Sequence, residues 1–376
     1  MNLLFLALIL GGCNKDKNGQ KKNRTNDTGT EAQSIIEVTT WSVTTPDDSA
    51  MDVEIEIGPD VTSFMLTGES RKEVGMEGVV DPDGKVLLYW DDWWDSDESL
   101  TDAIFGYETT TALNWPIRDV EDPLREGTYV VQVAALGGGG NYTSGKVDLT
   151  LHTKKDPSMS EGKVHARIVY TGDVDSDPDI VAATEDSVER WREIWAIHGV
   201  ELVETYDSAP TIDAHLGFWR NGDEALLDVA DGLEPGSVVL YLGESVDGDF
   251  DTYGIAGGIP GTLANSPFTY VVVSWLSHAG FDAQFTKGEK SIMGETMAHE
   301  IGHYMGLYHP VEDGFNYWDA LQDTPRCERR GACEDELASN LMFPYSVCSY
   351  SGDDCVAAGE LSVDQQGVVH RYTGTQ

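Results

Sequence analysis

The 376-residue sequence predicts a multidomain protein in which an antiparallel β-sandwich over residues 34–155 precedes a mixed α/β domain over residues 160–376. Short runs of alternating apolar and polar residues, separated by turn-forming residues, predict the sandwich. After residue 160 the pattern changes to strands that alternate with amphipathic helices, which predicts a mixed, twisted sheet. The length is sufficient for two or three domains that each bury a core.

The first 13 residues, MNLLFLALILGGC, have the pattern of a signal peptide. The apolar run 3–10 is too short to cross a bilayer and suits the centre of such a peptide. Its end, LGGC, resembles the lipobox of bacterial lipoproteins, which implies cleavage before Cys13 and lipid on its sulfur. No Lys or Arg precedes the run, which departs from the usual pattern of such signals. An ordinary secretory signal, in which Cys13 has no role, is the alternative. We expect an exported protein, held at the cell envelope or surface through Cys13 or otherwise secreted.

Residues 14–33 are polar and contain almost no apolar side chain. Such a segment cannot offset the entropy cost of ordering, so it predicts a flexible tether between a membrane anchor and the folded part.

The chain is strongly acidic, with 24 Lys and Arg against 66 Asp and Glu and a net charge of −42. Binding of nucleic acid depends on clustered cations, so this balance argues against a nucleic-acid partner. It fits a protein with a solvated acidic surface.

Alternating runs predict the sandwich strands, and DPDG and GGGG segments predict turns between them. The expected strands are residues 53–57, 64–66, 86–90 and 129–133. A tryptophan-rich run, WDDWW at residues 90–94, suggests a carbohydrate or protein contact made by the sandwich; the alternative is a run that is half core and half loop.

The second domain is expected to begin near residues 154–157. Its predicted strands are residues 164–170, 200–203, 238–242 and 270–275, with a helix over residues 180–198. The glycine-rich stretch 254–261 suggests the edge of a cleft, where a peptide could add as an extended strand. A surface loop is the alternative.

The segment HEIGHYMGLYH carries the strongest signal in the chain. Residues four apart lie on one face of a helix, so His299 and His303 can bind the same ion. A straight helix would carry His309 about 15 Å further along, so the chain must turn after the helix for this side chain to join them. Gly306 permits a left-handed turn, and Pro310 prevents the helix from continuing. The spacing therefore predicts a zinc site with three imidazole ligands and one open position.

Glu300 follows the first of these histidines and is expected to point toward the open position of the ion. A carboxylate there can take the proton of a zinc-bound water, which then attacks a polarised carbonyl. The chemistry predicted by His299, Glu300, His303 and His309 is hydrolysis of a peptide bond.

The elongated motif resembles that of the metzincin zinc metalloproteases. DTP at residues 323–325 and SNLM at residues 339–342 are similar to the pappalysin (cytophagalysin) branch. The resemblance implies a metzincin-type domain with an active-site helix and a Met-turn, in which Met342 lies beneath the histidines. It also implies a tyrosine that binds zinc or the oxyanion. Here Tyr345 lies one residue later than is common, so the alternative is a phenol that only packs.

The same resemblance implies that Asp354 lines a substrate pocket and favours Arg or Lys after the scissile bond; an acidic loop is the alternative. It implies structural calcium as well. The alternating aspartates at residues 173–179 lack the glycine and the final glutamate of an EF-hand, which favours an exposed acidic turn. Asn340 and the carbonyls around Asp323 are the other candidates for calcium.

Four cysteines, Cys327, Cys333, Cys348 and Cys355, lie within 30 residues. In an exported protein an even set predicts two disulfides, with three possible connectivities. A second zinc site is the alternative, although the chain has no C-x-x-C pair.

The sequence thus favours a zinc-dependent endopeptidase that acts on proteins or peptides. A catalytically inactive binding lipoprotein that retains the peptidase fold is the alternative, and hydrolysis of a non-peptide amide is a third possibility. The presence of Glu300 argues against an inactive protein, because a binding module has no physical need for a general base.

Overall fold

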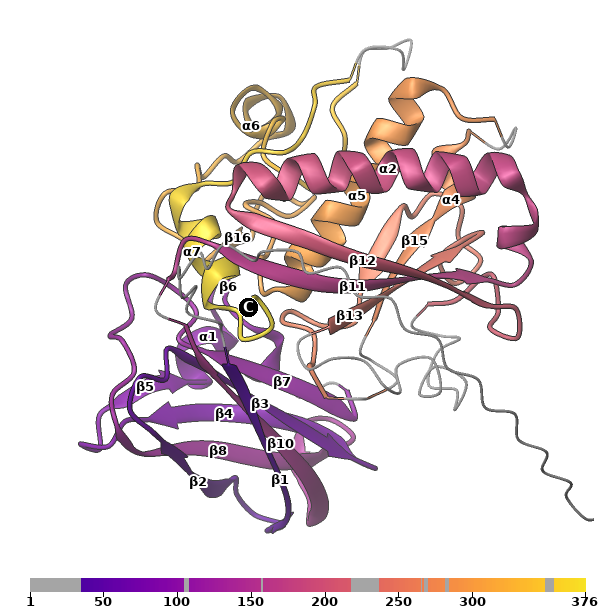
Figure 1. Ribbon diagram of the computed structural model, residues 1–376. Helices are drawn as coiled ribbons and strands as arrows, with labels where there is room; N and C mark the ends of the chain where they lie inside the picture. The colour runs from indigo at the N-terminus through magenta and orange to yellow at the C-terminus, as the bar shows by residue number, and fades with distance from the viewer. Residues whose placement is uncertain are drawn as a thin grey trace, which may run out of the picture. The chain divides into compact units, whose positions relative to one another are not determined.

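The computed structural model describes residues 35–104, 108–156, 158–217, 237–264, 266, 270–280, 284–348 and 355–376 (Figure 1). Cys13, the predicted tether and Asp354 lie outside these residues. Gln33–Gln376 forms one compact unit, so the predicted division near residues 155–160 stays a prediction.

Two antiparallel sheets form the first half of the described chain. One has the order β1-β10-β3-β7, and the other has the order β2-β8-β4-β5 with β9 beside β8. The bounds are β1 Ile35–Thr45, β2 Met51–Ile57, β3 Ser63–Ser70, β4 Glu73–Val80, β5 Val86–Tyr89, β7 Thr110–Trp115, β8 Gly127–Gly137, β9 Asn141–Tyr142 and β10 Gly145–Lys155.

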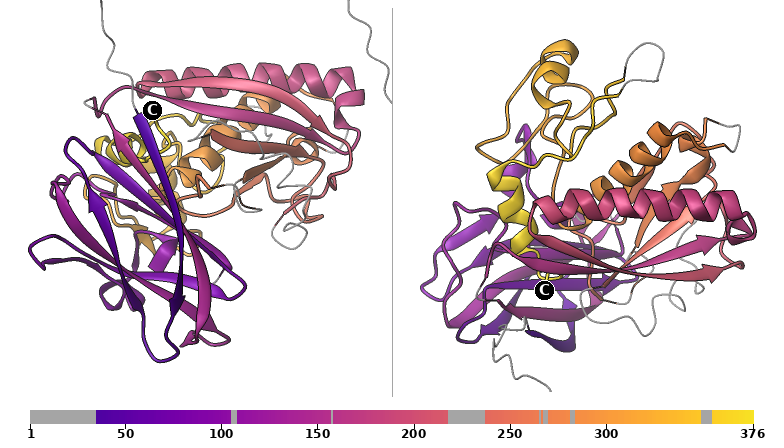
Figure 2. Two further views of the ribbon diagram at one scale, coloured as in Figure 1. Left: turned by 60° about the horizontal axis from the view of Figure 1, so that its bottom comes forward. Right: turned by 45° about the horizontal axis from the view of Figure 1, so that its top comes forward.

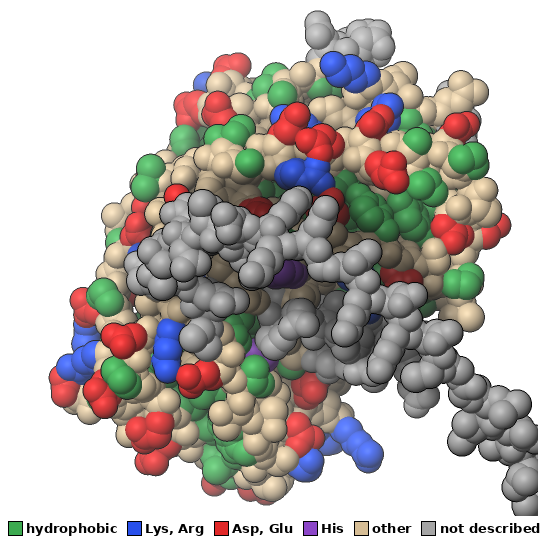
Figure 3. Space-filling model, viewed as in Figure 1, with side chains coloured by type: hydrophobic (Ala, Val, Ile, Leu, Met, Phe, Trp, Pro, Cys, Tyr) green, Lys and Arg blue, Asp and Glu red, His purple; other side chains and the backbone are tan. Residues whose placement is uncertain are grey.

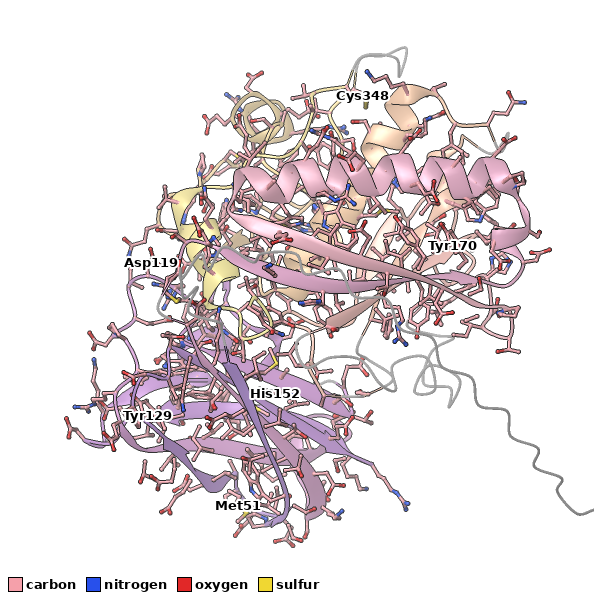
Figure 4. The ribbon with its side chains drawn as sticks, in the orientation of Figure 1. Met51, Asp119, Tyr129, His152, Tyr170 and Cys348 are labelled. Carbon is pink, nitrogen blue, oxygen red and sulfur yellow. A yellow bond between two sulfur atoms is a disulfide. The ribbon has the colours of Figure 1, made fainter. Side chains whose placement is uncertain are left out.

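Alternation along β2 explains why this half folds as two facing layers. Val53, Ile55 and Ile57 are buried, and the acidic residues between them are exposed. One face of the strand therefore packs on the core while the other is solvated. Tyr129, labelled in Figure 4, is buried on β8, and its ring lies 6.3 Å from that of Phe64 on β3.

The tryptophan-rich run lies outside the strands, because β5 ends at Tyr89 and Asp91–Trp94 forms the short helix α1. Trp90 and Trp93 pack against the core, and Arg118 lies over the Trp93 ring at 5.4 Å from its centroid. Trp94 is 52% exposed. The run is thus partly core, and a carbohydrate or protein contact there stays a prediction.

A five-stranded sheet forms the centre of the second half, in the order β12-β11-β13-β15-β14. The strands are β11 Gly162–Thr171, β12 Val200–Ala209, β13 Ser237–Gly243, β14 Gly254–Ala256 and β15 Tyr270–Ser274. The first four in this order are parallel, and β14 is an antiparallel edge strand. The strand predicted over residues 270–275 ends one residue early, because the Ser274 hydroxyl caps α4 (Trp275–His278).

Two long helices pack against each other beside this sheet (Figures 1 and 2). Helix α2, Pro178–Ile197, begins at the side-chain cap of Asp177. Helix α5, Lys287–Tyr304, begins with a capping box formed by Thr286 and Glu289. The helices approach closely at Gly294, where a Cβ atom would lie 2.3 Å from the backbone oxygen of Ser187. Only glycine fits this crossing.

Short elements complete the structure. They are β6 Glu98–Ser99, η1 Asp102–Ile104, η2 Val174–Ser176, β16 Trp318–Asp319, α6 Arg330–Leu337 and α7 Val363–Arg371. The parallel pair β6–β16 joins the segment between β5 and β7 of the first half to the second half.

The four cysteines pair in sequence order, as Cys327–Cys333 and Cys348–Cys355. Two disulfides were predicted, and the structure selects one of the three possible connectivities. Cys348 is labelled in Figure 4. Disulfides are consistent with an exported protein.

No helix in the described part of the chain is long and apolar enough to span a membrane. Figure 3 shows Asp and Glu side chains scattered over the visible face, in agreement with the predicted acidic surface.

Candidate metal centre

The helix that carries the first two histidines ends as the sequence predicts. Its C-cap is Met305, and Gly306 has a φ of 103°. The Gly306 amide donates to the His303 carbonyl at 2.8 Å, and the Leu307 amide donates to the Gly302 carbonyl at 2.9 Å. These two bonds form a Schellman motif, which needs a residue with positive φ after the cap. The bend returns the chain toward the helix.

Three imidazoles meet at this bend. The Nε2 atom of His309 lies 3.2 Å from Nε2 of His299 and 3.1 Å from Nε2 of His303. Zinc binds imidazole nitrogen at about 2.0–2.1 Å, so two nitrogens of a tetrahedral site lie about 3.3–3.4 Å apart. Among the described residues, these histidines are the group of three or more metal-ligating side chains close enough to hold an ion.

The other ring nitrogen of each histidine fixes the tautomer. His299 Nδ1 lies 2.7 Å from the Leu341 carbonyl, and His303 Nδ1 lies 2.6 Å from the Leu307 carbonyl. A carbonyl can only accept, so each Nδ1 carries the hydrogen and donates it. His309 Nδ1 lies 2.8 Å from the Glu312 carboxylate, which is likewise an acceptor.

The donor set fits a divalent cation. With all three hydrogens on Nδ1, three Nε2 lone pairs face one another with no proton between them, an arrangement that a cation stabilises. Burial and the neighbouring imidazole of His309 lower the pKa of His299 to about 3. Burial and the other two imidazoles also lower the pKa of His303. Both rings are therefore neutral near pH 7, as a metal ligand must be.

Glu312 was not identified from the sequence. Metal-binding histidines commonly donate their second nitrogen to a carboxylate, which orients the ring and increases its basicity. A glutamate three residues after His309 is the signal that could have found it.

Glu300 is buried on the same helix, and burial raises its pKa to about 8. Strand β14 passes directly over it, because a Cβ atom at Gly254 would lie 2.7 Å from Glu300 Cγ and 3.0 Å from Oε1. Glycine at this position leaves room for the carboxylate between the helix and the edge strand.

Met342 packs beneath the histidine helix. Its side chain is fully buried, and a Cβ atom at Gly302 would lie 2.5 Å from its sulfur. The turn that holds it is fixed by Asn340, whose Oδ1 accepts from the Met342 amide at 2.9 Å and whose Nδ2 donates to Gln365 at 2.8 Å. The structure thus places Met342 against Gly302, which lies on the helix between the first two histidines.

Tyr345 lies in the same pocket as His299 and Glu300. The pocket has a volume of about 80 Å³ and is also lined by Tyr253 and Thr296. The Tyr345 ring is tilted by 56° against that of Phe343, with 4.7 Å between the ring centroids, and the guanidinium of Arg330 lies over it at 4.8 Å from its centroid. Its hydroxyl is buried and has no hydrogen-bond partner among the described residues.

Strand β14 is at the edge of the sheet, so along one side its backbone N–H and C=O groups pair with no other described strand. The Ser274 amide donates to the Tyr253 carbonyl, and the Gly257 amide donates to the Tyr270 carbonyl. In an antiparallel ladder the bonded residues alternate, so Gly254 and Ala256 turn their N–H and C=O groups away from β15. The predicted glycine-rich stretch therefore begins as an edge strand beside Glu300.

A residue of the first half supports both sides of this site. Asp102 accepts from the Tyr308 hydroxyl at 2.5 Å and from the Ile259 amide at 3.1 Å. Tyr308 precedes the third histidine, and Ile259 follows the edge strand. Nothing in the sequence connects residue 102 with residues more than 150 positions away.

The candidates for calcium have other contacts. Asp177 caps α2, and Asp175 accepts from the Ser208 hydroxyl at 2.6 Å. The Asp323 carboxylate accepts from the Asp364 amide at 3.0 Å. The amide of Asn340 is bonded on both sides, as described above. Calcium at any of these positions stays a prediction.

Comparisons with known proteins add little to this geometry. No family model and no curated protein matches the sequence. Among solved structures, the chain is similar in part to the crystal structure of metalloproteinase-II from Bacteroides fragilis. The match has 12% identity and a TM-score of 0.25, and it covers 50% of this chain and 59% of that chain. The function is therefore argued from the site itself.

Proposed function

We propose that the protein is a zinc-dependent endopeptidase of the metzincin type, similar to the pappalysin branch. The observation that carries the proposal is the convergence of three Nε2 lone pairs at 3.1–3.2 Å, each fixed by an acceptor at Nδ1. A buried carboxylate, Glu300, lies beside them under an edge strand with free backbone groups.

A zinc ion bound by His299, His303 and His309 would act as a Lewis acid toward a peptide carbonyl and would acidify a water molecule. Glu300 accepts the proton of the attacking water and delivers it to the leaving amine.

Substrate binding is assigned to the edge strand. An extended peptide would pair with the outward N–H and C=O groups of Gly254 and Ala256, which brings its backbone past Glu300. Tyr345 is proposed to donate its unpartnered hydroxyl to the oxyanion that forms on the carbonyl. Asp354 is proposed to line the pocket beyond the scissile bond. A Tyr345→Phe change tests the hydroxyl, and a loss of kcat of at least about tenfold is expected.

The experiment that tests the proposal combines metal analysis with proteolysis. The purified protein should contain one zinc ion per chain, and casein hydrolysis should disappear with a chelator and return with zinc. Glu300→Ala should retain zinc and lose turnover, whereas His303→Ala should lose zinc. His165→Ala, a histidine on β11 outside the site, is the matched control and should keep both. Absence of bound metal in the folded protein would refute the proposal.

Zinc binding without cleavage of any peptide library would support the inactive binding protein instead. Attachment at the cell envelope through lipid on Cys13 is part of the proposal and is tested separately. Cys13→Ala should release the protein from the membrane fraction, and mass spectrometry of the wild type should find the lipid.

A further inference from the structure

A second pocket lies between the sandwich and the segment that follows the edge strand. Its volume is about 340 Å³. One wall comes from Asp102, Glu108 and strand β7, and the other comes from the loop that runs from Ala256 to Thr262. Ala256 also belongs to the edge strand assigned to the substrate backbone, whereas Glu108 and the residues of β7 have no role in the site described above.

The pocket walls combine apolar surface with acidic side chains. Ala112, Ala256, Ile259 and Pro260 supply apolar surface, and none of the described residues that line the pocket is basic. Asp102 has its carboxylate bonded to neutral donors only, the Tyr308 hydroxyl and the Ile259 amide, so its charge is not compensated by an ion pair. The Glu108 side chain is exposed.

The neighbours of these carboxylates are also acidic. Partial desolvation at the pocket wall and the nearby Glu73 raise the pKa of Glu108, and desolvation together with the nearby Glu312 raises the pKa of Asp102. A cation placed between them would relieve this unfavourable arrangement, and apolar surface beside it would suit an aliphatic stem. Lys and Arg side chains combine these two features.

The position of the pocket relates it to a bound peptide. Strand β14 begins at Gly254, over Glu300, and runs toward Gly257 and Ile259 in the pocket wall. One residue of extended chain spans about 3.3 Å, so the pocket begins about two residues from the reaction centre. A peptide antiparallel to β14 runs in the opposite direction and therefore reaches the pocket with residues on the N-terminal side of its scissile bond.

We propose that this pocket is a substrate subsite, built jointly by the sandwich and the edge loop, that binds a Lys or Arg side chain about two to four residues before the scissile bond. The inference rests on the proposed peptidase function and adds a specificity to it. It also assigns the sandwich a part in substrate selection, with Glu108 as the residue that determines the preference for positive charge.

Cleavage of a peptide library tests the subsite. Wild-type protein should cleave peptides with a basic residue at one of these positions in preference to matched neutral peptides. Glu108→Gln should lower the ratio of basic to neutral kcat/KM by roughly fivefold, because one charge-assisted contact is lost. Glu108→Lys should invert the preference. Glu54→Gln is the matched control, because it removes the same charge from an exposed position on β2 of the sandwich and should leave the ratio unchanged.

A peptide-binding measurement, which needs no cleavage, tests the subsite independently of the peptidase proposal. A labelled basic peptide should bind to the Glu300→Ala protein more tightly than its neutral counterpart, and adding Glu108→Gln should remove the difference. If no library peptide is cleaved, the peptidase proposal fails, and this binding comparison decides the subsite alone. The subsite is refuted if the wild type cleaves without the preference. Equal shifts in the Glu108 and Glu54 variants, or a preference only after the scissile bond, also refute it.

Discussion

Asp319 is a buried carboxylate whose second oxygen has no hydrogen-bond partner among the described residues, and its replacement by asparagine should reveal the destabilisation that results. The residue is 2% exposed on β16, in a small cavity beside Gly306 and Tyr308. Its Oδ1 accepts from the Thr324 hydroxyl at 2.5 Å and from the Leu321 amide at 3.3 Å. Its Oδ2 has no hydrogen-bond partner among the described residues.

The magnitude follows from the pKa. Burial raises the pKa of Asp319 from 3.8 to about 7, against the opposing effect of its two hydrogen bonds. The shift is about 3 units, and each unit corresponds to about 1.4 kcal/mol. Between these two values the folded state holds a proton that the unfolded state has released, so stability falls as pH rises. The ionised carboxylate should therefore make the free energy of unfolding about 4 kcal/mol lower above pH 7 than it is below pH 4.

Asparagine has the same shape and no titration. The free energy of unfolding of Asp319→Asn minus that of the wild type should increase from pH 4 to pH 7 and become constant above pH 7. Urea unfolding in a series of buffers measures this difference, and any fixed cost of the amide appears as a constant offset. Asp313→Asn removes the same charge at an exposed position and is the control for the loss of one negative charge.

A flat difference for Asp319→Asn would show that the carboxylate is not protonated in the folded protein. A difference that decreases as pH rises would show a lowered pKa, as expected if a cation binds Oδ2. Either result would refute the reasoning.

Three further changes test the support of the metal centre. Gly302→Ala should destabilise the fold by about 1–3 kcal/mol, because the new Cβ would meet the Met342 sulfur at 2.5 Å; thermal unfolding measures it, and an unchanged Tm would contradict the packing. Gly306→Ala should lower the free energy of unfolding by about 1–2 kcal/mol, because alanine is strained at this positive φ, and it should weaken metal retention. Unfolding and metal analysis measure the two effects. The new Cβ atom would meet nothing closer than 3.5 Å, so a steric clash is not the cause. Glu312→Gln should lower zinc affinity about 10–100-fold in a chelator competition, and equal affinity would show that this carboxylate does not support His309.

The bend that unites the histidines was predictable because its causes are local. His299 and His303 are fixed by helical spacing, and Gly306 permits the turn that brings His309 back to them. All the information lies within eleven residues. The same holds for α2, whose start is fixed by Asp177 and whose apolar spacing marks its buried face.

The supporting contacts could not be predicted, because they join residues that are distant in sequence. The acceptor of His299 is the backbone carbonyl of Leu341. Every residue has a backbone carbonyl, so the sequence cannot indicate which one accepts this bond. The pairing of the cysteines depends on the path of the chain between them, so the sequence allowed three possible disulfide connectivities. The sequence could not assign Tyr345 for a related reason: its ring packs on Phe343, and its buried hydroxyl has no hydrogen-bond partner among the described residues.

The sandwich was predicted as an accessory domain, and the structure shows contacts between this half and the segments that hold the candidate site. Asp102 bonds both to Tyr308, next to the third histidine, and to Ile259, behind the edge strand. The Lys154 ammonium, fully buried at the end of β10, donates to the His370 carbonyl at 2.9 Å. In the folded protein, these polar groups of the first half form hydrogen bonds to the second half in place of hydrogen bonds to water. Separating the halves would break these bonds and expose the groups to solvent. The histidine loop and the edge strand are therefore positioned jointly by both halves, so residues of the sandwich can act on the proposed site from a distance.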